Sequence, residues 1–277
     1  MTLSKLLCQN RTLIMGVLNI TPDSFYDGGE FYDADKAIER TVQMVEEGAD
    51  IIDIGGESSR PGADPVSDSE ELRRVLPVIS ALNEAIDIPI SIDTYKSVVA
   101  EKALDAGATI INDISGLRGD NLMAQLASER DVHSIIMHMK GTPRTMQVNP
   151  SYDDLMTELV NYFEERIAFA LSTGISREKI ILDPGIGFGK RVADNFVILN
   201  ELQKICDLGY PVMIGPSRKS FIGKTLELPE NERLEGTSAS ITAAILNGAK
   251  IVRVHDVKEM RRVVLISDAI RLEGAAA

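Results

Sequence analysis

Eight short apolar runs, rich in isoleucine and valine, recur along the whole chain and constrain its fold more than any other feature. Their apolar residues are continuous rather than alternating, which predicts parallel strands that are covered on both faces. The runs are LIMGVLNI (13–20), DIIDIGG (50–56), IPISIDT (88–94), TIINDIS (109–115), HSIIMHM (133–139), IILDPG (180–185), PVMIGPS (211–217) and KIVRVHD (250–256).

Amphipathic segments lie between these runs and predict helices, because their apolar residues recur at spacings of three and four. The clearest are 34–47, 68–85, 96–106, 152–171 and 194–208. Several end at a glycine just before the next apolar run, as in EEGAD, DAGAT, STGIS and NGAK, which is the expected joint between a helix and a parallel strand. Eight such units predict an α/β fold, a single (β/α)₈ TIM barrel with long loops after the first and second strands.

The main alternative fold is a doubly wound open sheet, which usually carries a GxGxxG motif after its first strand. Here the first strand leads into LNITPDSFYDGG instead. No linker rich in proline or serine and no shift in composition divides the chain. We therefore expect residues 1–277 to form one domain.

The charge and the cysteines exclude several classes of protein. The formal net charge is −13, from 29 Lys and Arg against 42 Asp and Glu, and so acidic a surface predicts no binding to nucleic acid or to anionic membranes. No apolar run approaches the ~18 residues of a membrane span, and the N-terminus lacks the apolar stretch of a signal peptide. Cys8 and Cys206 suggest neither a disulfide framework nor a zinc site. We expect a cytoplasmic protein.

Polar side chains stand at the end of nearly every apolar run. In a barrel these ends meet at one rim, where the chemistry of the fold is found. Helix capping would explain one or two of them, and for Asp183, which precedes Pro184, it stays an alternative. The whole ring predicts a polar pocket at the rim. Its members are Asn19, Asp53, Glu57, Asp93, Asn112, His138, Asp183, residues 217–219, Arg253 and His255.

Two kinds of ligand chemistry are suggested by this ring. In a chain of negative net charge, a group of cations predicts an anion site, although surface ion pairs are the alternative. The cations are Arg60, Arg218, Lys219 and Arg253. Asn19 offers a hard oxygen to Mg²⁺, which often binds through few protein groups plus substrate phosphates, but taken alone it equally suits a turn. The carboxyl and amide groups of Asp93, Asn112 and Asp183 suit a heterocycle with several N–H donors.

The segment ILDPGIGFGK (181–190) resembles a phosphate-binding loop only at first sight. Pro184 stands where the Walker A motif needs its first glycine, and Arg191 stands where it needs serine or threonine. We therefore expect no nucleotide site in this loop, and we expect Lys190 to lie outside the ligand contacts.

Seven motifs together closely resemble those of dihydropteroate synthases, in the order of that family and over essentially the whole chain. They are NITPDSFYDGG (19–29), GGESSRPG (55–62), SIDTYK (91–96), NDISG (112–116), LDPGIGFGK (182–190), GPSRKS (215–220) and RVHDVKE (253–259). The resemblance implies a transferase of folate biosynthesis, which joins 6-hydroxymethyl-7,8-dihydropterin pyrophosphate to p-aminobenzoate and gives 7,8-dihydropteroate and pyrophosphate. Two alternatives are a pterin-binding methyltransferase domain and a non-catalytic pterin-binding homologue.

The resemblance also implies roles for single residues. Arg60, Asp93, Asp183 and Lys219 would be catalytic. The pterin ring would contact Asp93, Asn112, Ile114, Met137, Asp183, Phe188, Gly215 and Lys219. The pyrophosphate and p-aminobenzoate would contact Ser59, Arg60, Ser220, Arg253 and His255, with Mg²⁺ on Asn19.

Loops and assembly follow from the same resemblance. The loops 20–30 and 58–64 would close over the second substrate, and a homodimer would form through the helices of the last barrel units. Ser59 and Tyr26 depart from common family residues, and Pro216 stands at a position that varies in the family, which leaves sulfonamide susceptibility open.

Overall fold

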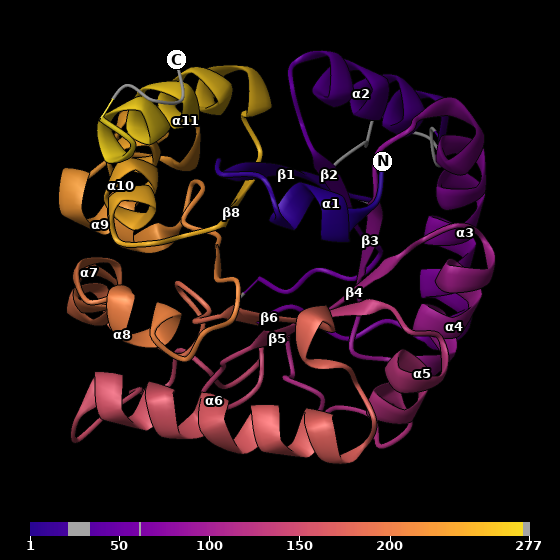
Figure 1. The fold of residues 1–277 in the computed structure, drawn as a ribbon, viewed down its shortest axis with the longest axis horizontal. Helices are drawn as coiled ribbons and strands as arrows, with labels where there is room; N and C mark the ends of the chain where they lie inside the picture. The colour runs from indigo at the N-terminus through magenta and orange to yellow at the C-terminus, as the bar shows by residue number, and fades with distance from the viewer. Residues whose placement is uncertain (22–33, 61, 274–277) are drawn as a thin grey trace.

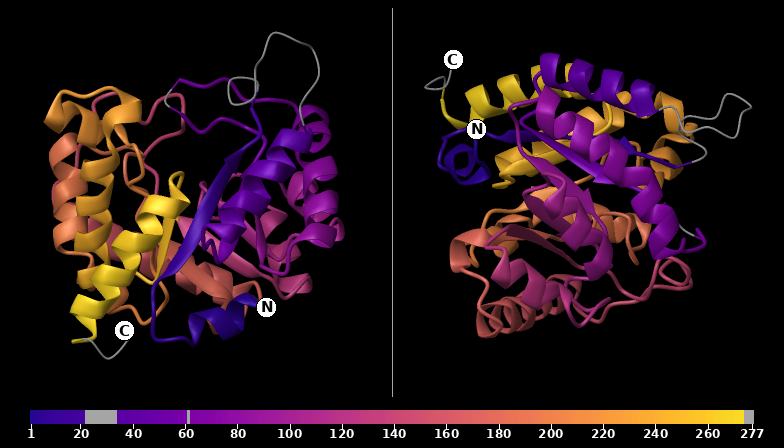
Figure 2. Two further views of the ribbon diagram at one scale, coloured as in Figure 1. Left: turned by 90° about the horizontal axis from the view of Figure 1, so that it is seen from above. Right: turned by 90° about the vertical axis from the view of Figure 1, so that its right-hand side faces the viewer.

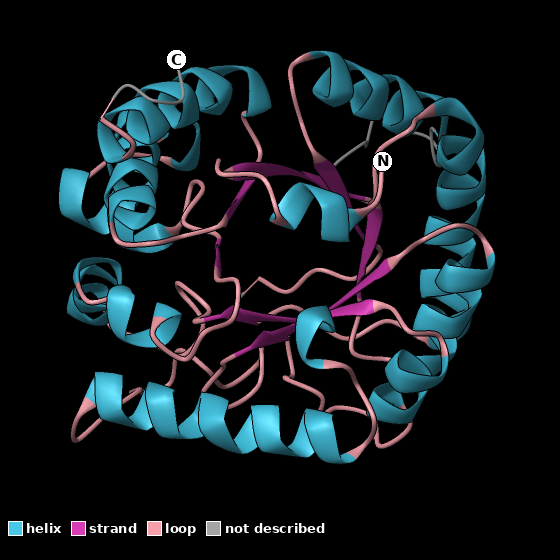
Figure 3. Ribbon diagram, in the orientation of Figure 1, coloured by secondary structure: helices cyan, strands magenta, loops and turns pink. Residues whose placement is uncertain are grey.

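The computed structural model describes residues 1–21, 34–60 and 62–273, and within them eight parallel strands form a barrel surrounded by helices (Figures 1 and 3). Most of the predicted loop 20–30, with Tyr26, lies outside the described residues. The strands follow the order β6-β5-β4-β3-β2-β1-β8-β7, and a parallel bridge between Leu182 and Val212 joins the ends of this series. The predicted (β/α)₈ barrel is confirmed.

Each of the eight predicted apolar runs contains one strand. The shortest is β7, which keeps only two residues. The strands are β1 (Leu13–Asn19), β2 (Ile51–Gly55), β3 (Ile90–Asp93), β4 (Ile110–Asp113), β5 (His133–Met137), β6 (Ile180–Asp183), β7 (Met213–Ile214) and β8 (Ile251–Val254).

Helices follow every strand and form the outer layer. The predicted helix 194–208 is two helices, because Glu201 leaves the helical conformation after Asn200. Ser67 and Asp154 cap α3 and α6 by accepting backbone N–H groups of the first turn. The helices are α2 (Ala34–Glu46), α3 (Asp68–Ala85), α4 (Ser97–Asp105), α5 (Met123–Glu129), α6 (Leu155–Ser172), α7 (Val192–Asn200), α8 (Gln203–Cys206), α9 (Ser220–Leu226), α10 (Leu234–Leu246) and α11 (Val257–Arg271). None of the helices in the described segments is long and apolar enough to cross a membrane.

The barrel interior is filled with apolar side chains over its lower half. A cluster of inward residues is closed from below by Leu3 and Leu6 of α1 (Leu3–Leu7), which lies across the end where the strands begin (Figure 2). The inward members are Leu13, Met15, Ile51, Ile110, Ile135, Ile181, Met213 and Ile251. This plug leaves only the opposite end of the barrel, where the strands finish, for polar groups.

Candidate functional site

The two-residue period of the strands explains why polar groups gather at that upper end. Successive side chains of a strand alternate between its faces, so the residue two positions after an inward apolar side chain also points inward. Ile51, Ile110, Ile181 and Ile251 occupy the lower layer. Their upper counterparts are Asp53, Asn112, Asp183 and Arg253, and Asp93 follows Ser91 in the same way.

Arg253 links the ends of three strands through two carboxylates. Its Nε lies 2.6 Å from Asp53 Oδ2, and its Nη2 lies 2.8 Å from Asp93 Oδ2. Asn112 donates to the same Asp53 oxygen over 3.0 Å. Burial opposes the charge of Arg253, but the neighbouring carboxylates of Asp53 and Asp93 outweigh it and raise its pKa above the usual range. Asp53, which the resemblance did not assign, therefore holds the network together.

The carboxyl groups of Asp93 and Asp183 are largely buried at this rim. Burial raises the pKa of Asp93 to about 7, although the charge of Arg253 opposes the change. Burial also raises the pKa of Asp183, against the hydrogen bond that Gly185 N–H donates over 2.8 Å. Asp183 is followed by a turn, and α7 begins only at Val192, so the capping alternative for Asp183 is wrong. Both groups suit N–H donors of a ligand.

Lys219 lies beside Phe188 at the mouth of the barrel. Its Nζ is 4.1 Å from the centre of the phenyl ring, within the range of a cation–π contact. Burial lowers the pKa of Lys219 to about 8, and the charge of Arg253 lowers it further. The lysine stem passes over Gly187, where a Cβ would approach Lys219 Cδ to 3.2 Å and where φ is +81°. A side chain at Gly187 would therefore displace the lysine.

An apolar cluster forms one wall of the site. Ile114, Met137 and Phe188, all expected from the resemblance to contact the pterin, pack together with Met139 and Met146. Methionine side chains adapt to the shape of a flat ring more easily than branched ones. The structure thus brings the three predicted apolar contacts to one place.

Two side-chain oxygen atoms lie near Gly55. A Cβ at Gly55 would lie 3.7 Å from both Asn19 Oδ1 and Asp93 Oδ2. Asp93 Oδ2 already accepts from Arg253, so of the two Asn19 Oδ1 is the one left for Mg²⁺, which prefers oxygen ligands and keeps several positions for water and phosphate. No group of three His, Cys, Asp or Glu that could hold a metal occurs in residues 1–21, 34–60 and 62–273. Any ion here would therefore need substrate oxygens.

Two of the predicted cations, Arg60 and Arg218, form ion pairs away from Arg253 and Lys219. Arg60 is 70% exposed and pairs with Glu230 over 3.2 Å, although its charge still acts on Lys219. Arg218, included in the predicted anion site, is instead neutralised by Asp256, whose Oδ2 accepts from Nε over 2.9 Å.

The other predicted contacts lie around the rim. Ser59 is partly buried and Ser220 is exposed at the start of α9. Gly215 lies beside Arg253, since a Cβ there would make an ordinary van der Waals contact with Arg253 Cβ at 3.7 Å. His255 follows β8 directly, and its Nδ1 lies 3.0 Å from Ser217 Oγ.

Lys190 is buried, and the expectation that it lies outside the ligand contacts stays a prediction. Only 3% of the residue is exposed. Its Nζ lies 3.0 Å from His138 Nδ1 and donates to the carbonyl oxygens of Phe188, at 3.0 Å, and of His138, at 3.3 Å. Burial lowers its pKa to about 7. Lys190 therefore ties the loop that carries Phe188 to the end of β5.

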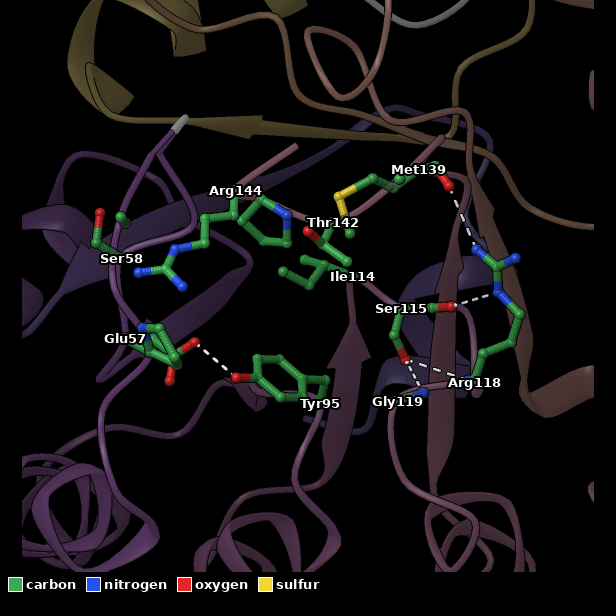
Figure 4. Close-up of a pocket in the computed structure, with 14 residues that line it drawn as sticks. Glu57, Ser58, Tyr95, Ile114, Ser115, Arg118, Gly119, Met139, Thr142 and Arg144 are labelled. Atoms are coloured by element: carbon green, nitrogen blue, oxygen red, sulfur yellow. Dashed lines mark hydrogen bonds between the residues drawn. The ribbon is translucent and has the colours of Figure 1, made fainter. Parts of the chain in front are cut away.

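A cavity of about 670 Å³ adjoins the apolar cluster between the loops that follow β2 to β5 (Figure 4). Ile114 belongs to both, so the cavity opens beside the predicted pterin contacts. In its wall Tyr95 donates to Glu57 over 2.9 Å, and Arg144, which also lines the cavity, pairs with Asp64 over 2.6 Å. Of these residues, the sequence indicated Glu57 and Ile114.

Comparison with known proteins adds independent information. The model of the family described as pterin binding enzyme matches residues 15–255. Dihydropteroate synthase of Bacillus subtilis is 46% identical over 98% of this chain and 93% of its own length. The structure of Yersinia pestis dihydropteroate synthase with a sulfonamide drug has a TM-score of 0.90 and 43% identity, covering 95% of both chains. That of the Clostridium difficile enzyme in the presence of pteroic acid has a TM-score of 0.89 and 50% identity, covering 94% of this chain and 97% of the other.

Proposed function

The chain belongs to the dihydropteroate synthase family of pterin-binding enzymes, and from this premise we propose how its rim residues share the work of the reaction. It is a transferase of folate synthesis that joins 6-hydroxymethyl-7,8-dihydropterin pyrophosphate to p-aminobenzoate. The products are 7,8-dihydropteroate and pyrophosphate. The two alternatives, a methyltransferase domain and a non-catalytic homologue, are therefore set aside.

The pterin is assigned to this site because buried polar groups of the rim lie beside an apolar wall. The carboxyl groups of Asp93 and Asp183 and the amide of Asn112 accept and donate hydrogen bonds at the edge of the ring. The faces of the ring pack against the apolar cluster of Ile114, Met137 and Phe188. Lys219, above Phe188, adds a donor at the mouth, and Gly215 lies beside Arg253. The pteroic acid present with the Clostridium difficile enzyme supports this class of ligand.

The pyrophosphate lies, in this proposal, on the opposite side of the rim with Arg253 and His255. Asn19 would hold Mg²⁺ together with pyrophosphate oxygens, and the ion would neutralise charge on the leaving group. Arg253 also contacts the pterin half, since its guanidinium pairs with Asp93 as well as with Asp53. Arg253 can therefore contact both the pterin ring and the pyrophosphate.

The chemical step follows from these positions. The bond between the exocyclic methylene carbon and the pyrophosphate oxygen breaks, and its electron pair leaves with the pyrophosphate. Positive charge develops on the pterin methylene, where the carboxylates of Asp93 and Asp183 stabilise it. The amine of p-aminobenzoate gives its lone pair to that carbon and releases one proton to water at the rim. A nucleophilic residue of the protein is not required.

The second substrate approaches over the exposed part of the rim, near Ser59, Arg60 and Ser220. We propose that the carboxylate of p-aminobenzoate replaces Glu230 as the partner of Arg60. The ion pair between Arg60 and Glu230 supports this exchange because it is solvent-exposed, with 51% of the Glu230 side chain accessible. Exposed ion pairs contribute only ~0–1 kcal/mol to stability, so this one can be exchanged at little cost.

The oligomeric state and the location of the protein in the cell are also proposals. We propose a homodimer through α10 and α11, because apolar side chains are exposed there: Leu246, Leu265, Ile266 and Ile270. Light scattering on Ile266→Lys should then show monomers where the wild type is dimeric, and a variant that stays dimeric would exclude this surface. A cytoplasmic location rests on the composition alone.

A direct assay tests the activity. Purified protein incubated with Mg²⁺, the pterin pyrophosphate and labelled p-aminobenzoate should release labelled dihydropteroate and one pyrophosphate per product. Omission of the pterin substrate is the control. Folded protein that forms no product under these conditions would refute the assignment.

A further inference from the structure

Ser217 lies directly behind the imidazole of His255 and has no role in the reaction as described above. It is 5% exposed. Its Oγ accepts the backbone N–H of His255 over 3.2 Å and lies 3.0 Å from Nδ1 of the same residue. Arg40 donates to the carbonyl of His255 over 3.3 Å, so the backbone of His255 is held at both its donor and its acceptor.

The number of protons and lone pairs on Ser217 decides the direction of the second hydrogen bond. A serine hydroxyl has one proton to donate, and the backbone N–H of His255 already occupies one lone pair. Within the described segments, the hydroxyl has no hydrogen-bond partner other than His255. If Nδ1 carried the imidazole proton, the hydroxyl proton would point at no acceptor in that part of the chain, which is unfavourable for a buried donor. The hydroxyl therefore donates to Nδ1.

The imidazole is also neutral at physiological pH. Burial lowers the pKa of His255 to about 3, and the charges of Arg253, Arg218 and Lys219 lower it further. A neutral ring whose Nδ1 accepts a hydrogen bond carries its proton on Nε2.

We propose that Ser217 is a positioning residue of the leaving-group site, which holds neutral His255 as the Nε2–H tautomer and orients it as a donor to pyrophosphate. The inference rests on the proposed contact between His255 and pyrophosphate. A neutral donor stabilises the pyrophosphate without adding another positive charge beside Arg253 and Lys219. Such fixing of a histidine tautomer by the partner of its other nitrogen is a general device of active sites.

Nitrogen NMR of the full-length protein tests the tautomer directly. The chain has three histidines, so the signals of His255 can be assigned with His255→Gln. The wild type should show a protonated Nε2 and an unprotonated Nδ1 for His255, and Ser217→Ala should show exchange between ring states. A wild-type His255 that carries its proton on Nδ1 would overturn the inference.

Calorimetry tests the consequence. Ser217→Ala should bind magnesium pyrophosphate about five- to tenfold more weakly, the loss expected for one impaired hydrogen bond to an anion, with unchanged affinity for 6-hydroxymethylpterin. Ser217→Thr should restore the affinity. Ser240→Ala is the matched control, because Ser240 is 8% exposed and donates to Gly236 O over 2.7 Å.

The role of Ser217 and the contact between His255 and pyrophosphate are tested by separate variants. A pyrophosphate affinity of Ser217→Ala within twofold of the wild type would overturn the role of Ser217. If His255→Ala, which has no donor at this position, also leaves pyrophosphate binding unchanged, the proposed contact between His255 and pyrophosphate itself fails, whatever the tautomer.

Discussion

Lys190→Met is the perturbation whose effect on stability the structure specifies best. The variant keeps the length of the side chain and removes its buried ammonium. The unfolded chain binds the lysine proton with a pKa of 10.5, whereas burial lowers the pKa to about 7 in the folded protein. Between these values the unfolded state binds more protons, so the wild type gains stability as the pH rises. From pH 7 to pH 9.5 the gain is ~3 kcal/mol.

The methionine variant lacks this gain, because it has nothing to titrate at position 190. At pH 7 two effects oppose each other: the carbonyl oxygens of His138 and Phe188 lose their donor, but the desolvated charge is gone. Urea unfolding of both proteins at the two pH values isolates the linkage, since other titrating groups cancel in the difference. The free energy of unfolding should shift by ~3 kcal/mol in favour of the wild type. Lys102→Met, at an exposed lysine, is the control. An equal difference at both pH values would contradict the reasoning.

Two further predictions concern the reaction. The pH profile of kcat/KM should fall below about pH 7, because Asp93 becomes protonated, and above about pH 8, because Lys219 loses its proton; a flat profile from pH 6 to 9 would exclude both roles. Glu230→Gln should lower the KM for p-aminobenzoate by up to about fivefold, since Arg60 no longer has a competing carboxylate. Glu232→Gln, in the same turn, is the control in steady-state assays, and an unchanged KM in Glu230→Gln would show that Arg60 does not bind this substrate.

The barrel and the position of its site could be predicted from the sequence for one physical reason. Strands covered on both faces leave long apolar runs, and the topology of a parallel barrel then collects the residues that follow them, such as Asp183 and Arg253, at one rim. Because side chains alternate between the two faces of a strand, the sequence also indicates which residues of each run face the interior of the barrel.

What the sequence could not predict depends on the path of the loops. Gly185 and Gly189 have φ values of +68° and +64°, and a Cβ would meet His138 O at 2.1 Å and Lys140 O at 2.5 Å. These contacts hold the loop against the end of β5 and bury Lys190. The spacing of apolar residues in the sequence contains no signal for this burial. The pairing of Arg218 with Asp256 likewise depends on a turn in which Arg218 has φ of +56°.

Asp183→Asn can test the division of the rim into a pterin half and a leaving-group half. Isothermal calorimetry should measure 6-hydroxymethylpterin and magnesium pyrophosphate separately on the same folded variant. We predict that pterin binding is lost, because one of the two acceptor oxygens becomes an NH2 donor that opposes the N–H donors of the pterin, while pyrophosphate binds with the affinity of the wild type. A variant that still binds the pterin normally, or that loses both ligands equally, would contradict the account.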